Sequence, residues 1–424
     1  MRTPPQIKPV VVDKMALPVE MVMPNGVPVY LLEEKNKGIV RFELLFKGGY
    51  AIQDKPLQAT FTNRMLREGA GEFSSDGISH KLDYYGAWIE GYSSQKCNHL
   101  VLHCLSKHFV PLLNLLEAIV KRPVFPENNL DVVRRGGKAH YEVNSKKVDV
   151  VAQRHFEYAL WGESHPLGHI VQAFDYDNIS RDDLVSYHKR VYNSNNLAIF
   201  ISGDVGEREM LAIKEVFGNN KWGESDSSAD NIIVENPQSM PGRHNVKMEG
   251  AIQSAVKIGF MAMDVSNPDF HKFRFLTVLL GGYFGSRLMS NIREENGYTY
   301  HISAEVDAYG KRNAFMISSE TANEYVDLCI KEIYKELDRL CNDPISEDEV
   351  EHVRNYILGE MCRECEGLAA KSEVFVNAWL SEQSFTSVNE YLEVVKNISA
   401  GELSRVAKEY LKPCNMIEVV VGNN

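Results

Sequence analysis

A chain of 424 residues is too long for one ordinary domain, so two or three domains are expected. Apolar residues make up 44% and charged residues 25%, a balance that argues against a disordered or membrane-spanning protein. The formal charge of -12 argues against nucleic acid as a partner, because phosphate binding needs clustered Lys and Arg.

The seven Cys form an odd and dispersed set, which is typical of free thiols in a reducing compartment. Cys362 and Cys365 are the one close pair, and they fall within a predicted helical run at 347–366. A second pair that would complete a zinc site is missing, so we interpret them as two thiols on one helix face. The first fifteen residues contain three Pro and no apolar stretch of the secretory kind, which predicts a cytoplasmic protein.

The first half of the chain predicts a mixture of strands and helices. An Asn25-Gly26 turn joins the first two strands, and a short amphipathic helix with the sequence ATFTNRMLRE ends at Gly69. We therefore expect an α+β layer in which helices pack against a mainly antiparallel sheet. The predicted strands and helices are, in chain order, strands in 21–34 and 40–46, the helix in 59–68, strands in 88–95 and 99–105, and a helix in 108–120.

An internal repeat organises the whole chain. Residues 178–203 align without a gap on residues 397–422, and residues 127–134 echo residues 347–354 at almost the same offset. Each longer copy predicts a Ser N-cap, an amphipathic helix, a polar break and a strand. The two echoes occur in the same order, which indicates two tandem copies of one α/β unit. The identities in the longer alignment are Asn178/Asn397, Ile179/Ile398, Ser180/Ser399, Leu184/Leu403, Lys189/Lys408, Asn196/Asn415 and Gly203/Gly422.

A polar segment rich in Gly, Ser, Asn, Asp and Pro separates the copies, and such a composition predicts a connection rather than a core element. We place an N-terminal domain at 1–225, a linker at 226–244 and a C-terminal domain at 245–424.

The order of motifs resembles the insulinase/pitrilysin family of zinc metallopeptidases over nearly the whole chain. The segments that carry the resemblance are LLFKGGYAIQDKPLQATFTNRMLREGAG, FPENNLDVVRR, SHPLGHIVQAFDYDNISRDDLVSYHKRVYNSNNLAIFISGDV and, in the second copy, GGYFGSRLMSNIREENGYTYHISA.

Active members of this family carry H-x-x-E-H on a helix, where two His bind zinc and the Glu acts on the metal-bound water. The resemblance places Thr60, Asn63 and Arg64 at the His, Glu and His positions. Arg64 is a permanent cation and would oppose a divalent metal. We therefore expect no metal ligands and no cofactor in this chain, and zinc in a partner subunit.

The family's third protein ligand, a distant Glu, would fall at or near Tyr141, between His140 and Glu142. A neighbouring Glu cannot restore a site that lacks its first two ligands. Two other His pairs are closely spaced, one in a predicted strand and one in a loop without a ligand role in the family, and neither predicts a metal site: His99 with His103, and His165 with His169.

The second copy of active members supplies an Arg and, seven residues later, a Tyr that hydrogen-bond the substrate carbonyl oxygen. Arg293 and Tyr300 have this spacing, and a guanidinium and a phenol are suitable oxyanion donors. Tyr298 competes for the phenol role. Alternatively, Arg293 pairs with a carboxylate such as Glu294 or Glu295 and Tyr300 is a core aromatic residue.

The resemblance also implies that peptides add to an edge strand, where Glu90, Gly91 and Tyr92 are the candidate substrate-binding residues. An ordinary sheet edge or bulge explains this stretch equally well. The segment GGYFGSRL lacks the pattern of a phosphate-binding loop and is interpreted as a glycine-rich turn near the substrate.

The residues and the resemblance together predict a zinc-free subunit of a heterodimeric peptidase that acts on peptides or unfolded chains. Its partner would be a homologous H-x-x-E-H subunit, and the chain alone would be inactive. The alternative is a non-enzymatic scaffold or peptide-binding member of the same family.

Overall fold

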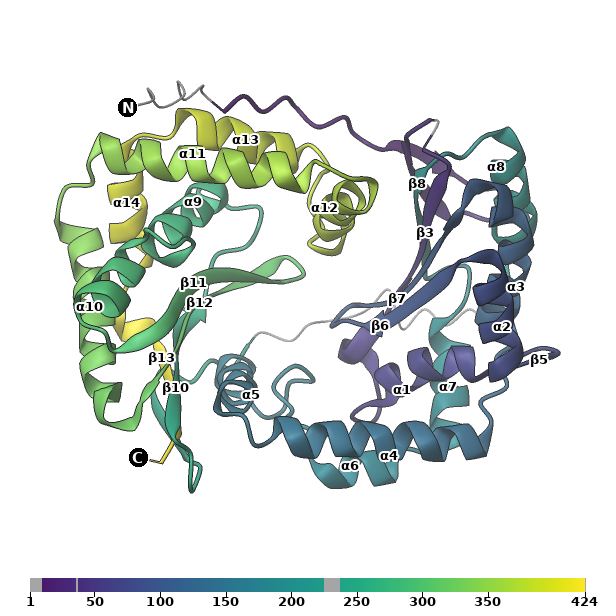
Figure 1. Cartoon of the computed structure of the whole chain (residues 1–424), viewed down its shortest axis with the longest axis horizontal. Helices are drawn as coiled ribbons and strands as arrows, with labels where there is room; N and C mark the ends of the chain where they lie inside the picture. Colours follow the sequence, from purple (N-terminus) through teal and green to yellow (C-terminus); the bar gives the residue numbers. More distant parts are fainter. Residues whose placement is uncertain (1–9, 36, 225–236, 424) are drawn as a thin grey trace, which may run out of the picture. The chain divides into compact units, whose positions relative to one another are not determined.

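The computed structural model describes residues 10–35, 37–224 and 237–423. Within them the chain forms two compact units (Figure 1). The N-terminal unit contains residues 17–146 and 161–224, and the C-terminal unit contains residues 10–16, 147–160 and 238–423. Each unit consists of a sheet with helices packed against it, which confirms the predicted α+β class.

The N-terminal unit contains a six-stranded sheet with the order β1-β2-β8-β3-β7-β6. Its neighbours pair antiparallel except β2 and β8, which are parallel. The strands at the Asn25-Gly26 turn and those at 40–46, 88–95 and 99–105 are confirmed. The strand bounds are β1 (Val19–Val22), β2 (Pro28–Glu33), β3 (Ile39–Lys47), β6 (Trp88–Ser93), β7 (Cys97–Leu105) and β8 (Leu197–Gly203), with a small hairpin of β4 (Gly69–Ala70) and β5 (Phe73–Ser74).

Helices cover one face of this sheet, and α2, α3 and α8 lie along it in Figure 1. Alternate residues of β3, among them Phe42 and Leu44, point into a core that also contains Leu116 of α3 and Met65 of α1. This two-residue period is the reason that one face of the strand is apolar and packed. The helix bounds are α1 (Gln58–Met65), α2 (Ser75–Tyr85), α3 (Phe109–Lys121), α4 (Glu127–Asn144), α6 (Ala173–Asn178), α7 (Arg181–Val191) and α8 (Glu207–Ile213).

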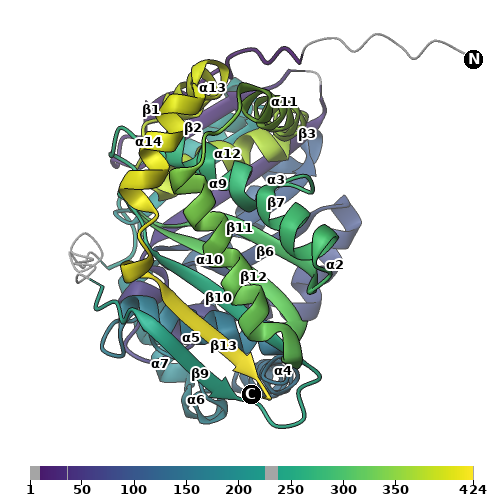
Figure 2. The ribbon, with the colours of Figure 1, turned by 90° about the vertical axis from the view of Figure 1, so that its left-hand side faces the viewer.

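The C-terminal unit contains a five-stranded sheet with the order β11-β12-β10-β13-β9, in which β13 and β9 are the parallel pair. Figure 2 faces this unit and shows α9 and α10 crossing the sheet. The strand bounds are β9 (Gly242–Lys247), β10 (Gln253–Met261), β11 (Thr299–Tyr309), β12 (Arg312–Ala322) and β13 (Ile417–Gly422). The helix bounds are α5 (Val148–Trp161), α9 (Phe270–Gly281), α10 (Val326–Asn342), α11 (Glu347–Glu364), α12 (Leu368–Leu380), α13 (Ser387–Asn397) and α14 (Ala400–Tyr410).

The two sheets repeat one topology. The order β2-β8-β3-β7-β6 corresponds strand by strand to β9-β13-β10-β12-β11, with the parallel pair at the same place. Edge strand β6 therefore corresponds to edge strand β11. The internal repeat seen in the sequence is thus a repeat of topology.

The aligned Ser residues cap equivalent helices. Ser180 accepts a hydrogen bond from the Asp183 N–H at the start of α7, and Ser399 accepts one from the Glu402 N–H at the start of α14. In both helices the acidic side chain bonds back to the Ser N–H, completing a capping box. This arrangement confirms the predicted Ser N-caps.

Two segments belong by contact to the C-terminal unit although they precede it in the chain. In the N-terminal arm, Val12 is buried, and the Met15 N–H donates to Asn389 Oδ1 of α13 over 2.8 Å. In α5, the Phe156 ring lies against Gly259 of β10. The predicted domain boundaries were derived from the repeat in the sequence, and they remain a prediction. Of the predicted linker, residues 226–236 lie outside the described residues, whereas residues 242–244 already belong to β9.

All seven Cys are free thiols in the structure, and Cys362 lies on α11 while Cys365 caps its C-terminal end. Among the described residues, no helix combines the length and apolar character that crossing a bilayer requires.

Candidate functional site

Arg293 and Tyr300 lie together on the C-terminal unit. Arg293 belongs to the π-helical turn η6 (Met289–Glu295), and Tyr300 is the second residue of β11. The Arg293 Cζ atom lies 5.1 Å from the centroid of the Tyr300 ring, a cation–π contact. The Tyr300 side chain is 85% exposed, so it is not a core aromatic residue. In the described part of the chain, no carboxylate forms an ion pair with Arg293.

Tyr298, the competing candidate for the phenol, has a different environment. Its ring stacks on Tyr325 with centroids 5.3 Å apart and packs against the apolar core. Its carbonyl oxygen accepts a hydrogen bond from the Thr321 hydroxyl. Of the two tyrosines, Tyr300 is the one beside Arg293.

The backbone that carries the pair is irregular on both sides of Gly297. The turn η6 is anchored by Asn291, whose amide donates to Glu336 Oε1 over 2.6 Å and to Glu332 Oε2 over 3.1 Å. The register of β11 against β12 shifts between Thr299 and Ile302, where Tyr300 lies. π-helical turns and strand irregularities redirect side chains and are frequent at functional sites.

The glycine-rich segment after α9 packs next to the pair. A Cβ on Gly281 would lie 2.6 Å from the Ala304 backbone nitrogen, so only glycine lets the end of α9 approach β11 this closely. The next residues lead to Phe284, whose ring centroid lies 4.6 Å from Arg293 Cζ. The predicted turn therefore contributes an aromatic side chain. Phe284 was not among the predicted site residues, although an aromatic residue within a glycine-rich motif close to Arg293 was a usable signal.

The helix that resembles the zinc-binding helix carries no zinc ligand set. Asn63 is buried, and its amide donates to the His99 carbonyl oxygen over 3.0 Å and to the Tyr192 hydroxyl over 3.2 Å. Thr60 is half-buried and Arg64 is exposed on the same helix. A hydroxyl, a committed amide and a guanidinium do not fit zinc, which prefers imidazole, thiolate and carboxylate.

The position of the third ligand does not change this result. Tyr141 on α4 is half-buried and packs against Tyr176 with ring centroids 5.5 Å apart, while His140 and Glu142 are exposed. Across the described ranges, no group of three or more His, Cys, Asp or Glu is arranged to hold a metal ion.

The candidate peptide-binding residues lie on β6, which pairs with β7 and with no second strand among the described residues. Gly91 faces α1, and a Cβ there would lie 2.5 Å from Asn63 Oδ1. Glu90 and Tyr92 project from the opposite face and are exposed. The backbone of this edge is therefore open to an added strand, while Gly91 allows the helix to pack closely behind it.

A buried ionic network lies beneath the edge strand. Arg41 Nη1 and His99 Nδ1 contact the two oxygens of Glu43 at 2.6 Å and 2.9 Å, and Tyr92 stacks on His99. Burial alone would raise the pKa of Glu43, but the His99 hydrogen bond and the Arg41 charge outweigh it and leave this pKa below its ordinary value. His99 thus has Glu43 as its ionic partner. His103 stacks on Trp88, as His99 stacks on Tyr92.

The other candidate residues are placed as follows. His165 is buried against Trp161, whereas His169 Nε2 lies 3.5 Å from Asp175 Oδ2. The two His therefore do not form a metal site together. Arg293 and Tyr300 are brought together in one unit, as are Glu90, Gly91 and Tyr92 in the other.

Comparisons with known proteins agree with this fold. The family described as the peptidase M16 inactive domain matches residues 178–357. An uncharacterized zinc protease of Rickettsia bellii is 22% identical over 94% of this chain and 96% of its own. A Helicobacter pylori protein named non-peptidase homolog YmxG is 22% identical over 92% of this chain and 88% of its own. The crystal structure of the peptidase M16 inactive domain from Pseudomonas fluorescens has a TM-score of 0.86 and 19% identity, covering 96% of this chain and 98% of that chain.

The fold and the site define a peptidase-like protein of two repeated α+β units whose first-unit helix lacks zinc ligands. The chain is thus similar to members of the M16 peptidase family over nearly its whole length, which confirms the resemblance that its motifs indicated.

Proposed function

We propose that this chain is the zinc-free subunit of a heterodimeric M16 peptidase that acts on peptides or unfolded chains. Its homologous partner carries H-x-x-E-H and the zinc ion. This chain contributes Arg293 and Tyr300, which donate hydrogen bonds to the substrate carbonyl oxygen as it gains charge. An extended peptide pairs with the edge strand β6 near Glu90, Gly91 and Tyr92.

The observation that carries the proposal is that Arg293 has an aromatic neighbour but no carboxylate partner among the described residues. Its guanidinium lies beside an exposed tyrosine, and no carboxylate in the described residues neutralises it. An arginine whose role is structural usually pairs with an acid or with backbone carbonyls. An unpaired guanidinium next to a phenol suits a ligand that is an oxygen carrying partial negative charge.

The remainder of the chain supports dependence on a partner. Thr60, Asn63 and Arg64 offer neither a metal site nor a base for activating water. We therefore expect no hydrolysis by this chain alone. We also propose that the two subunits act in the cytoplasm, in agreement with seven Cys that form no disulfide.

The test is to mix the chain with a neighbouring H-x-x-E-H homologue and to assay an unstructured peptide. Activity is expected in the mixture, absent from this chain alone and removed by a chelator. Arg293→Ala should lower kcat by about a hundredfold or more, as loss of one oxyanion donor does, without dissociating the pair. A matched control is Arg363→Ala, since Arg363 is exposed and pairs with Glu360 of its own helix. Full activity of the Arg293→Ala mixture would refute the assigned role.

The second candidate function is a non-enzymatic scaffold or peptide-binding protein. The relative named non-peptidase homolog favours it, as does the absence of zinc ligands on the helix 58–65. Under this function Arg293 and Tyr300 are dispensable. Peptide binding would then be unchanged by Arg293→Ala, and no mixture with a zinc-bearing homologue would gain activity.

A further inference from the structure

Arg293 is in cation–π contact with two aromatic rings. Its Cζ atom lies 4.6 Å from the Phe284 ring centroid and 5.1 Å from the Tyr300 ring centroid. Phe284 is 62% exposed and Tyr300 is 85% exposed. Among the described residues these rings hold the guanidinium, because no ion pair or hydrogen bond involves it. The rings therefore restrict a side chain that would otherwise be free to rotate.

The direction of Phe284 is imposed by its neighbours in the glycine-rich segment. Tyr283 turns toward α11, where its ring centroid lies 5.1 Å from that of Tyr356. Two residues after Gly285, Arg287 forms a two-pronged ion pair with Glu349 at 2.7 Å and 2.8 Å. The segment is thus held on both sides of Phe284, and the close approach of Gly281 to Ala304 holds its beginning on β11. Phe284 is left facing Arg293.

This construction differs from a chance surface aromatic. A lone exposed phenylalanine needs no explanation. Here an exposed ring is presented by a turn that is anchored by an ion pair, a tilted contact between two tyrosine rings and a glycine contact, and it lies in cation–π contact with the guanidinium. A guanidinium held by cation–π contacts alone still has its N–H groups available to donate to a carbonyl oxygen.

We propose that Phe284 is a positioning residue for Arg293. Its ring holds the guanidinium in the orientation in which Arg293 and Tyr300 together donate to the substrate carbonyl oxygen. The catalytic part of this inference rests on the proposed function. The orientation of Arg293 is a property of the chain alone and is tested without a partner.

The first experiment measures Arg293 in the isolated full-length chain. With arginine side chains labelled with ¹⁵N, the Nε–Hε signal of Arg293 is assigned by its loss in Arg293→Lys. We expect an order parameter in the rigid range for the wild type and for Phe284→Tyr, which keeps an aromatic ring. In Phe284→Ala the order parameter should fall to about 0.6 or below, the flexible range. An unchanged order parameter in Phe284→Ala would overturn the positioning role.

The second experiment measures hydrolysis of an unstructured peptide by the mixed pair. Phe284→Ala should lower kcat about three- to tenfold with little change in KM, since a cation–π contact orients the donor without binding the substrate. Phe284→Tyr should retain the wild-type kcat. The matched control is Phe174→Ala, because Phe174 is 59% exposed on α6 and has no recorded cationic partner in the described chain.

The two experiments separate the two ideas. If the wild-type mixture is inactive, the proposed function fails, and the NMR result still decides whether Phe284 orients Arg293. If the mixture is active and Phe284→Ala raises KM at constant kcat, Phe284 is a peptide contact and the positioning role is overturned.

Discussion

Arg134 donates a hydrogen bond from Nη2 to the Ile179 carbonyl oxygen over 2.7 Å, fastening α4 to the segment before α7. The same bond recurs in the other unit, where Arg354 Nη2 of α11 donates to the Ile398 carbonyl oxygen over 2.7 Å. The Arg residues come from the shorter sequence echo and the Ile residues from the longer one. The two echoes are therefore joined in space by one hydrogen bond in each unit.

These bonds predict matched losses of stability. Arg134→Ala and Arg354→Ala should each lower the free energy of unfolding by about 1.5–3 kcal/mol, the usual value for a hydrogen bond to a charged group. Urea unfolding followed by circular dichroism measures the loss. The control Arg363→Ala on α11 should leave stability almost unchanged, because its partner Glu360 is an exposed neighbour on the same helix. Equal losses in all three variants would contradict the prediction.

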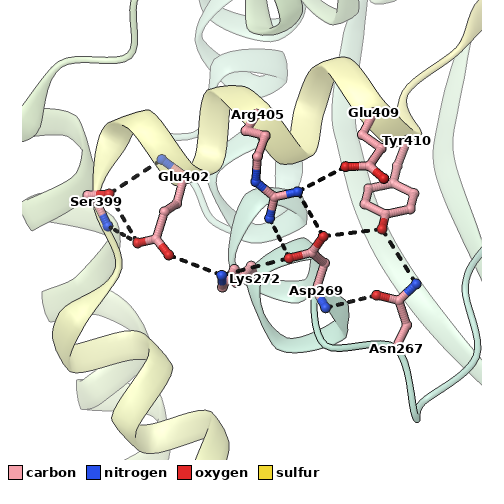
Figure 3. Close-up of polar contacts among 8 residues, drawn as sticks. All are labelled: Asn267, Asp269, Lys272, Ser399, Glu402, Arg405, Glu409 and Tyr410. Carbon is pink, nitrogen blue, oxygen red and sulfur yellow. Dashed lines mark hydrogen bonds and ion pairs between the residues drawn. The ribbon is translucent and has the colours of Figure 1, made fainter.

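Asp269, at the start of α9, predicts acid sensitivity of the C-terminal unit (Figure 3). Its carboxylate accepts hydrogen bonds from Arg405 and from the Tyr410 hydroxyl. The Arg405 hydrogen bond lowers the pKa of Asp269 despite partial burial, which opposes it. A lowered pKa contributes stability that is present above the ordinary aspartate pKa, about 3.9, and lost as the pH falls through the folded-state value.

Asp269→Asn should therefore lower the free energy of unfolding by about 1–3 kcal/mol at pH 7, and this loss should shrink as the pH falls below the ordinary aspartate pKa. Thermal unfolding at the two pH values measures the difference. Glu409→Gln serves as the control, because Glu409 contacts the same Arg405 in an exposed pair and should cost about 0.5 kcal/mol at most. A loss for Asp269→Asn that is independent of pH would show that its charge is not the cause.

Asp307 on β11 predicts the opposite dependence on pH. Burial and the neighbouring Glu305 raise the pKa of Asp307 to about 6, although Lys257 partly offsets them. The folded state therefore keeps a proton that the unfolded state loses, and stability declines as the pH rises from about 4 to about 6.

Asp307→Asn should raise the free energy of unfolding by about 1–3 kcal/mol at pH 8 and change it little at pH 4. Urea unfolding at both pH values tests this. Asp327→Asn is the control, because Asp327 forms an exposed pair with Arg243 and its replacement should be close to neutral. A destabilised Asp307→Asn variant at pH 8 would mean that its attraction to Lys257 outweighs its burial.

The helix α1, which carries no zinc ligands, predicts that the chain does not bind zinc. The wild-type chain, purified without a tag, should contain far less than one zinc per chain by elemental analysis. The quadruple variant T60H/N63E/R64H/Y141E should bind about one zinc, because it supplies two imidazoles and a carboxylate as ligands and a second carboxylate as base. Alanine at the same four positions is the control. Stoichiometric zinc in the wild type, lost on replacing residues 60–64, would contradict this account.

Local patterns in the sequence were sufficient for much of the fold. The Asn25-Gly26 turn, the Ser180 and Ser399 caps and the alternation along β3 were predicted because each depends on residues within a few positions of one another. The repeat predicted two units of one topology, and the motif spacing selected Arg293 and Tyr300.

The tertiary structure alone decided which partners these residues meet. Three such contacts join residues that no local pattern pairs. They are the parallel pairing of β9 with β13, the hydrogen bonds of the Asn63 amide to His99 and Tyr192, and the cation–π contact of Phe284 with Arg293. Contact also assigns α5 to the unit formed mainly by the second half of the chain. These pairings and contacts depend on chain closure and packing, which no local periodicity encodes.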